Sequence, residues 1–191
     1  MPRNTLILAS ASPRRQELLR EAGIEFEVYP AHISEDAHPG EPPIEYALRL
    51  AREKAEKVAR QFPQRFVLGA DTIVVVGSEN LGKPRDAQDA ARMLRLLSGR
   101  VHLVTTAVSV IAPGKAAVAR SSTTDVYFRK ISEEQIQEYI SGGEPMDKAG
   151  AYAIQGGAAG WVVRLEGDYS NVVGLPVPLV KQMLSESGFL D

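Results

Sequence analysis

The segment Leu6-Ile-Leu-Ala-Ser-Ala-Ser-Pro-Arg-Arg15 constrains the fold of this chain most strongly. Its apolar first half predicts a buried strand, and the Ser-Pro pair at positions 12 and 13 is typical of a helix N-cap and first helical position. A strand that turns directly into a helix is the first part of an α/β unit. Arg14 and Arg15 in the first helical turn oppose the helix dipole, which a bound anion would offset. The segment therefore indicates either a polyphosphate site that also uses Ser10, or a capped surface helix with two solvated arginines.

The composition is that of one globular domain, residues 1–191, with 44% hydrophobic and 24% charged residues. A net charge of −2 without any basic run argues against nucleic acids and membrane surfaces as partners. The absence of cysteine excludes disulfides, thiolate nucleophiles and thiolate metal sites. The N-terminal region lacks a signal-peptide pattern, and no apolar run approaches the roughly 20 residues of a membrane span. We therefore expect a cytoplasmic protein.

Helical and strand patterns alternate along the chain. The patterns predict helices over about 14–21, 44–58, 86–97, 132–141 and 179–187. They predict strands over about 6–9, 25–29, 66–70, 101–111, 116–128 and 161–165, with extended chain over 73–76 and a glycine-rich stretch at 150–160. No repeat or linker interrupts this order, so we expect a single α/β domain with a mixed sheet and flanking helices.

The common catalytic and nucleotide-binding motifs are absent. The sequence contains no G-x-S-x-G elbow, no Walker A loop and no G-x-G-x-x-G after a strand. His32 and His38 lie in a polar loop without metal-ligand spacing, and His102 lies in a strand, where a packed or edge position is expected.

Charged and polar residues at the ends of predicted elements remain as candidates. Asp71 directly follows a buried strand, which places a carboxylate at the rim of a sheet, where α/β proteins bind ligands, or else caps backbone amides. Lys54 borders the apolar stripe of the second helix, as a placed cation or as a lysine whose ammonium reaches solvent. Lys83 lies in a tight Gly-Lys-Pro loop. Its ammonium is either held in a binding site or is solvated as in an ordinary loop lysine. Gln155, before two glycines, either recognises the edge of a base or is a turn residue. With the loop carboxylate Glu35, these groups match the needs of Mg²⁺-assisted attack on a phosphoanhydride.

Seven short motifs resemble those of a known family. They are Ala9-Ser-Ala-Ser-Pro-Arg-Arg15, Gly69-Ala-Asp-Thr72, Gly82-Lys-Pro84, Leu97-Ser-Gly99, Asp147-Lys-Ala-Gly-Ala-Tyr152, Ile154-Gln-Gly156 and Val173-Gly-Leu-Pro176. Together, in this order, they resemble the Maf family of nucleoside triphosphate pyrophosphatases, once described as septum-formation inhibitors. The resemblance covers nearly the whole chain.

The resemblance implies hydrolysis between the α- and β-phosphates with a divalent metal, Mg²⁺ or Mn²⁺. It also implies an elongated, two-lobed α/β fold similar to inosine triphosphate pyrophosphatases, often as a homodimer. By the same resemblance, the catalytic and metal-binding positions are Asp71 and Glu35. The base-selecting positions are Arg14, Thr72 and Gln155, and the phosphate-binding positions are Ser10, Arg15, Lys54 and Lys83.

The segment Asp147–Gln155 resembles the branch of the family that acts on dTTP and UTP. We therefore expect removal of these and of modified pyrimidine nucleotides. One departure is Ser34, where many relatives carry an acid, so that Glu35 or Asp36 would have to compensate. The alternatives are a non-catalytic, nucleotide-binding regulator of septum formation, and the same fold acting on 7-methyl-GTP or inosine triphosphate.

Overall fold

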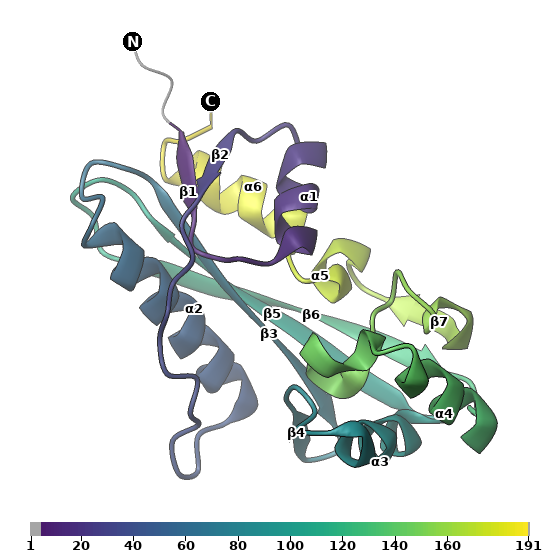
Figure 1. The fold of residues 1–191 in the computed structure, drawn as a ribbon. Helices are drawn as coiled ribbons and strands as arrows, with labels where there is room; N and C mark the ends of the chain where they lie inside the picture. Colours follow the sequence, from purple (N-terminus) through teal and green to yellow (C-terminus); the bar gives the residue numbers. More distant parts are fainter. Residues whose placement is uncertain (1–4, 191) are drawn as a thin grey trace. The chain divides into compact units, whose positions relative to one another are not determined.

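The computed structural model describes residues 5–190 and shows alternating strands and helices (Figure 1). The strands are β1 (Leu6–Leu8), β2 (Phe26–Val28), β3 (Val67–Val76), β4 (Glu79–Leu81), β5 (Val101–Ile111), β6 (Val118–Phe128) and β7 (Val162–Glu166). The α-helices are α1 (Pro13–Glu21), α2 (Pro43–Ala59), α3 (Ala87–Leu97), α4 (Glu133–Ser141), α5 (Tyr169–Val173) and α6 (Val177–Glu186). Three short 3₁₀ helices are η1 (Glu144–Asp147), η2 (Ala149–Ala151) and η3 (Ala159–Trp161).

The described strands form one mixed sheet in the order β2-β1-β3-β5-β6-β7, with β4 paired to β3. β1 pairs in parallel with both β2 and β3, whereas β3–β4 and β6–β7 are antiparallel. The predicted α/β class, with a mixed sheet and flanking helices, is confirmed. Three details differ from the prediction: Asp71 lies inside β3 and not at a strand end, the glycine-rich stretch contains 3₁₀ helices, and the short elements β4 and α5 were not expected.

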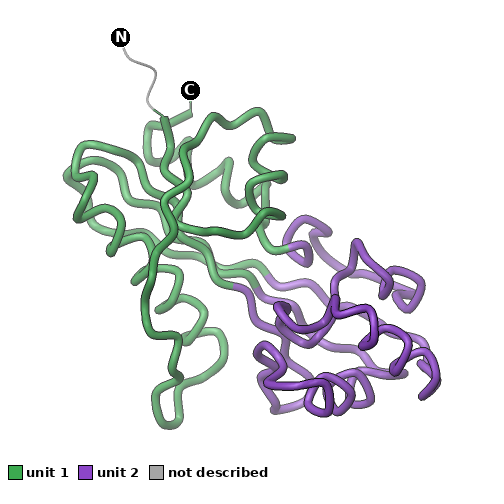
Figure 2. The backbone as a smooth tube through the Cα atoms, viewed as in Figure 1, with its two compact units in different colours: residues 1–71, 106–122, 174–191 green, residues 72–105, 123–173 purple. Residues whose placement is uncertain are grey.

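The chain divides into two compact units, and both are built from separate stretches of sequence (Figure 2). The first unit contains residues 1–71, 106–122 and 174–191, and the second contains residues 72–105 and 123–173. Each boundary before Gly174 falls inside a long strand: β3, β5 or β6. Asp71 is consequently the last residue of the first stretch of the first unit.

The core of the first unit forms around β1 and α2. All three residues of β1 are buried, as expected for a parallel strand with neighbours on both sides. One face of α2 is buried, with Ala51 and Ala55 among its residues. The buried cluster beneath this face includes Ile7 and Val67, so the helix closes over the parallel strands.

The second unit has an aromatic core. His102 is 1% exposed and lies edge-to-face with Phe128 and Tyr152, at 4.8 and 5.4 Å between ring centroids. Its Nε2 lies 2.7 Å from the Tyr152 hydroxyl oxygen. Burial lowers the pKa of His102 to about 4, so the ring is neutral near pH 7. The expectation that this histidine is a packed strand residue is confirmed. Between residues 5 and 190, no helix is both long and apolar enough to cross a membrane.

Candidate functional site

Two carboxylates from different parts of the first unit share the ammonium of Lys54. Lys54 Nζ lies 2.7 Å from Asp71 Oδ1 in β3 and 2.7 Å from Glu35 Oε1 in the loop before α2. Lys54 and Asp71 are each 8% exposed, whereas 48% of the Glu35 side chain is accessible. The ammonium is therefore held by carboxylates inside the unit and is not in bulk water. Three predicted site residues thus lie together.

Gly69 explains why α2 comes close enough to β3 for this contact. A Cβ atom at Gly69 would lie 2.4 Å from the backbone oxygen of Ala51 and 2.8 Å from the backbone nitrogen of Ala55. The backbones of strand and helix therefore touch where no side chain intervenes. Lys54 lies on the same buried helix face as these two alanines, and Asp71 follows Gly69 by two residues.

The predicted phosphate-binding turn between β1 and α1 is fixed by Arg15. The guanidinium donates through Nε to the Gly174 carbonyl oxygen at 2.8 Å and through Nη1 to the Ala70 carbonyl oxygen at 3.0 Å. Nη1 also donates to Ser10 Oγ at 3.2 Å, and this hydroxyl accepts from the backbone N–H of Ser12. Arg15 therefore joins the turn to the residue that precedes Asp71 and to the segment that leads into α6.

Arg15 feels both opposite and like charges at this turn. Burial lowers the pKa of Arg15, Asp71 opposes that shift, and the neighbouring positive charge of Arg14 adds to it. Arg14 itself is half-buried. Two cations at a helix N-terminus oppose the helix dipole, so an anion bound here would be stabilised by both.

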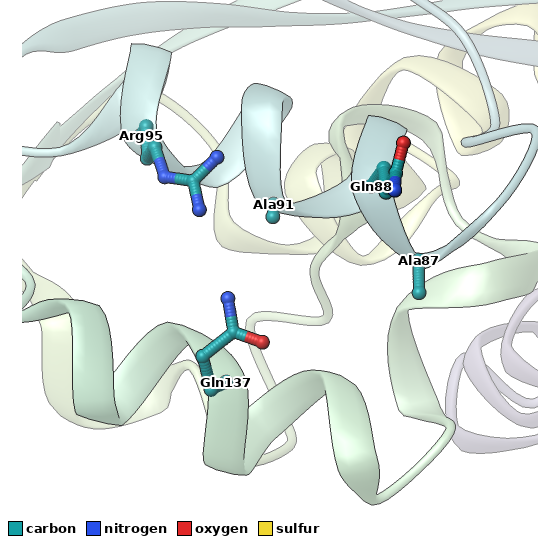
Figure 3. A pocket seen from close by; sticks show the side chains of 5 residues that line it. All are labelled: Ala87, Gln88, Ala91, Arg95 and Gln137. Carbon is teal, nitrogen blue, oxygen red and sulfur yellow. The ribbon is translucent and has the colours of Figure 1, made fainter.

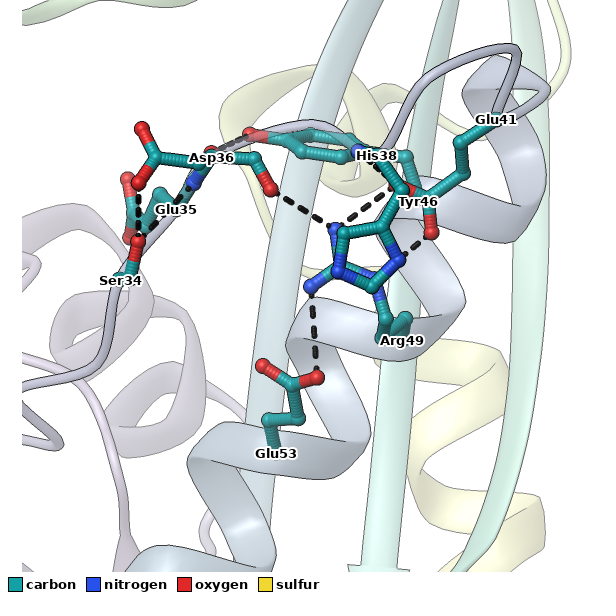
Figure 4. A network of polar contacts seen from close by, with 8 residues as sticks. All are labelled: Ser34, Glu35, Asp36, His38, Glu41, Tyr46, Arg49 and Glu53. Atoms are coloured by element: carbon teal, nitrogen blue, oxygen red, sulfur yellow. Dashed lines mark hydrogen bonds and ion pairs between the residues drawn. The ribbon is translucent and has the colours of Figure 1, made fainter.

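The acidic loop before α2 places Glu35 and Asp36 differently (Figure 4). Glu35 reaches Lys54, whereas the Asp36 carboxylate accepts a hydrogen bond from Ser34 Oγ at 2.6 Å. Ser34 also accepts from the Asp36 N–H at 3.3 Å. Glu35, and not Asp36, is therefore the acidic residue of this loop that pairs with Lys54.

Tyr46 and Arg49 of α2 hold this loop, and the sequence analysis did not single them out. Tyr46 Oη donates to the Glu35 carbonyl oxygen at 2.8 Å, and Arg49 Nη2 donates to the Asp36 carbonyl oxygen at 3.0 Å. Burial, with Asp71 and Glu35 nearby, raises the pKa of Tyr46 to about 12, so its hydroxyl remains a donor. Their helical spacing of three residues indicates a shared face but not what that face contacts.

The second unit holds the other predicted residues. Thr72 follows Asp71 along β3 and is half-buried, while Lys83 and Gln155 are exposed. The N–H of Gly150 donates to the Gly82 carbonyl oxygen at 3.1 Å, which joins the two motifs that contain these glycines.

Glu144 and Tyr139 fix the loop that carries Gln155, and they too were missed from the sequence. Glu144 Oε2 accepts from the Gly157 N–H at 3.2 Å, and Tyr139 Oη accepts from the Ala153 N–H at 3.0 Å. A Cβ atom on Gly156 would lie only 1.6 Å from Glu144 Oε1, so the carboxylate packs directly on the loop backbone. The main chain is thus fixed on both sides of Gln155.

A surface pocket of the second unit lies between α3 and α4 and contains none of the predicted residues (Figure 3). Its lining residues are Ala87, Gln88, Ala91, Arg95 and Gln137. Arg95 Nε already donates to Glu133 at 2.9 Å, and Gln137 Nε2 donates to the same carboxylate at 2.8 Å. The pocket therefore does not change the choice of site.

The donors around Lys54 fit a divalent metal in kind. Glu35 and Asp71 offer hard carboxylate oxygens that already converge on one cation. In residues 5–190, no group of three or more His, Cys, Asp or Glu side chains is arranged to hold a metal ion. Magnesium is commonly held by one or two carboxylates together with substrate phosphates. The site thus suits a metal that arrives with a polyphosphate.

Comparison with known proteins covers nearly the whole chain. A dTTP/UTP pyrophosphatase of Koribacter versatilis (strain Ellin345) is 55% identical over 185 residues, 97% of this chain and 95% of the relative. A dTTP/UTP pyrophosphatase of Citrifermentans bemidjiense (strain ATCC BAA-1014 / DSM 16622 / JCM 12645 / Bem) is 51% identical over 191 residues, 100% of this chain and 99% of the relative.

Among solved structures, the Staphylococcus aureus Ham1 protein gives a TM-score of 0.44 at 14% identity, over 65% of this chain and 71% of that chain. A likeness this distant supports no inference about activity. Residues 5–187 match the family described as Maf-like protein, and the match spans both units. The resemblance that the seven motifs indicated is confirmed: this chain belongs to the Maf-like protein family.

Proposed function

We propose that this protein hydrolyses dTTP and UTP, together with modified pyrimidine nucleotides, to the nucleoside monophosphate and pyrophosphate. The structural observation that carries the proposal is the buried Lys54 shared by Glu35 and Asp71, close to the two arginines of the β1–α1 turn. Cations that bind phosphates and carboxylates that bind a metal or orient water are the two requirements for hydrolysing a phosphoanhydride. The names of the relatives supply the substrates.

The cations of the site have different tasks in this proposal. Ser10 and Arg14 contact phosphate oxygens at the N-terminus of α1, the positive end of the helix dipole. Arg15 acts on the phosphates mainly through its charge, since its guanidinium binds Ser10 and two backbone carbonyls. Lys54 moves part of its bonding from the carboxylates to the phosphates, and Lys83 adds a further ammonium.

Asp71 is the catalytic carboxylate of the proposal. It orients or deprotonates the water that attacks the α-phosphorus, or it binds the metal together with Glu35. A bound Mg²⁺ or Mn²⁺ supplies neutralisation of the phosphate charge. Either role needs a carboxylate that is fixed, and the 2.7 Å contact with Lys54 and the position of Asp71 in a long strand both fix it.

Thr72 and Gln155 select the base in this proposal. A uracil or thymine edge presents two carbonyl oxygens and one N–H, and a glutamine amide supplies both a donor and an acceptor for that edge.

The proposal also includes residues 1–191 acting as one domain, a cytoplasmic location and a homodimer. The single-domain proposal is supported by three strands that belong to both units.

The decisive experiment measures pyrophosphate release from dTTP, UTP, CTP, ATP, GTP, inosine triphosphate and 7-methyl-GTP with Mg²⁺ or Mn²⁺. We expect preference for dTTP and UTP, and a loss of about 10²-fold or more in kcat for Asp71→Asn. Asp125→Asn in β6 makes the same chemical change at a half-buried strand position and keeps wild-type turnover. Thermal unfolding of both variants separates loss of catalysis from loss of folding.

The alternatives predict different outcomes. Release mainly from 7-methyl-GTP or inosine triphosphate would keep the reaction and replace the substrate. Nucleotide binding without release of pyrophosphate would favour the non-catalytic regulator. Full turnover by a folded Asp71→Asn variant would refute the assignment of the catalytic carboxylate.

A further inference from the structure

Glu35 is the more exposed of the two carboxylates that contact Lys54. Nearly half of its side chain is accessible, and it belongs to a loop, whereas Lys54 and Asp71 belong to regular elements and are buried. Loops are held by few contacts and open more easily than strands or helices. The position of the Glu35 carboxylate therefore depends on whatever fixes the main chain of this loop.

Tyr46 and Arg49 bind two successive carbonyl groups of that main chain. The Tyr46 hydroxyl donates to the Glu35 carbonyl oxygen at 2.8 Å, and Arg49 Nη2 donates to the Asp36 carbonyl oxygen at 3.0 Å. The Arg49 guanidinium carbon also lies 5.5 Å from the centroid of the Tyr46 ring. These contacts act on the backbone, so they fix where the Glu35 side chain begins (Figure 4).

Arg49 also holds the far end of the loop through Glu41. Its Nε and Nη2 donate to the two Glu41 carboxylate oxygens at 2.7 Å each, and Nη1 reaches Glu53 at 3.3 Å. Glu41 Oε2 in turn accepts from the His38 N–H at 3.1 Å. The bond from Arg49 lowers the pKa of Glu41 to about 2, so this carboxylate stays charged at neutral pH. A bidentate pair of this kind fixes direction as well as distance.

We propose that Tyr46 and Arg49 are positioning residues that hold Glu35 in the site by binding the backbone of its loop. The inference rests on the proposed function, because it assigns these residues to the same reaction. Both residues belong to α2, which also carries Lys54, so one helix sets the position of the loop and of the ammonium that Glu35 contacts.

The hydrogen bonds from Tyr46 and Arg49 to the loop backbone matter most when the nucleotide is bound. Substrate phosphates compete with Glu35 for Lys54, and the ion pair that restrains the Glu35 side chain in the free protein is then weakened. The bonds from Tyr46 and Arg49 to the backbone remain, because neither residue contacts the phosphates in the proposed arrangement. Loss of these backbone hydrogen bonds should therefore lower kcat more than it raises KM.

The test compares Tyr46→Phe and Arg49→Lys with Tyr29→Phe. Tyr46→Phe removes only the hydroxyl, and Arg49→Lys keeps the charge but loses the bidentate geometry. Tyr29→Phe is the matched control, because it removes a hydroxyl that donates to Gln61 Oε1 at 2.6 Å elsewhere in the first unit. The measurements are steady-state pyrophosphate release from dTTP, thermal unfolding, and amide hydrogen exchange of residues 31–42.

We expect Tyr46→Phe to lower kcat about fivefold, with KM for dTTP changed less than twofold, since one backbone hydrogen bond is lost. Amide exchange over residues 31–42 should become about fivefold faster, while exchange in α2 is unchanged. Arg49→Lys should have the larger effect on both readouts, because it loses the bonds to Asp36 and Glu41 together. Tyr29→Phe should leave kcat at the wild-type value.

The outcomes separate this inference from the proposed function. A wild-type protein that releases no pyrophosphate would refute the proposed function. Wild-type turnover with unchanged kcat and unchanged loop exchange in Tyr46→Phe would refute the positioning role alone. A fall in kcat that Tyr29→Phe reproduces would also refute it, because the effect would then not belong to this loop.

Discussion

Gly69→Ala tests whether the close approach of α2 to β3 builds the site. The added Cβ would lie 2.4 Å from the Ala51 carbonyl oxygen, whereas ordinary contact begins at 3.4 Å, so the overlap is 3.4 − 2.4 = 1.0 Å. The Ala51 carbonyl oxygen and the Ala55 backbone nitrogen, 2.8 Å from the added Cβ, both belong to the backbone of α2. The helix itself must therefore move. Such overpacking typically costs about 1–3 kcal/mol, more than the 0.4–1 kcal/mol or so that alanine gains through the unfolded state.

A shift of about 1 Å would also separate Lys54 from Asp71, which now lie 2.7 Å apart. Misplacement on this scale costs about 10²-fold in rate. We therefore expect Gly69→Ala to lower Tm by about 3–5 °C, for a net loss of about 1.3 kcal/mol, and to lower kcat by about 10²-fold.

The assay is calorimetric unfolding beside pyrophosphate release from dTTP, well below the Tm of the variant. Gly160→Ala is the matched control, because its Cβ would meet no atom within 4 Å. Wild-type Tm and kcat in Gly69→Ala would refute the argument that this glycine sets the distance between helix and strand. A lowered Tm with wild-type kcat would show that the helix shift does not reach Lys54.

Two further predictions concern the second unit. Gly156→Ala would place a Cβ 1.6 Å from Glu144 Oε1, so the carboxylate must release the Gly157 N–H. We expect KM for dTTP to rise about fivefold at nearly constant kcat. An unchanged KM would contradict the role of this loop in binding. Burial lowers the pKa of His102 from its ordinary 6.5 to about 4, so the unfolded chain binds more protons than the folded chain between these pH values. The free energy of unfolding should therefore decrease as the pH is lowered from about 6.5 to about 4, by up to about 3 kcal/mol from this residue. Denaturant unfolding of wild type and His102→Gln at both pH values checks this, since the variant should lose less.

Local signals predicted the elements that frame the site. The apolar run before the Ser-Pro pair predicted β1 and α1, and Ser12 does accept from the Arg15 N–H as an N-cap, at 3.5 Å. The buried run before Asp71 was predicted as a strand and is the first half of β3, but the prediction that Asp71 follows the strand end is wrong, because β3 continues to Val76. Short-range patterns suffice here because caps and buried runs depend on neighbouring residues.

Partners that are distant in sequence were not predictable in the same way. The periodicity of α2 placed Lys54 at the edge of a buried face and left two alternatives open, because periodicity does not show what lies opposite. The answer depends on Gly69 and Asp71, 15 and 17 residues away along the chain. The helix α5 is five residues long, shorter than the length at which a helical period is recognisable.

The bonds of Arg15 have a consequence for the order in which the protein is made. The Arg15 guanidinium donates to the carbonyl oxygens of Ala70 and Gly174, and Gly174 follows Arg15 by 159 residues in the chain. A ribosome adds roughly 5–20 residues per second, so the β1–α1 turn waits many seconds for its last partner. During that interval the two arginines carry their charge in an incomplete turn. A nascent chain should therefore acquire its affinity for nucleotides late, only after the segment that leads into α6 has left the ribosome.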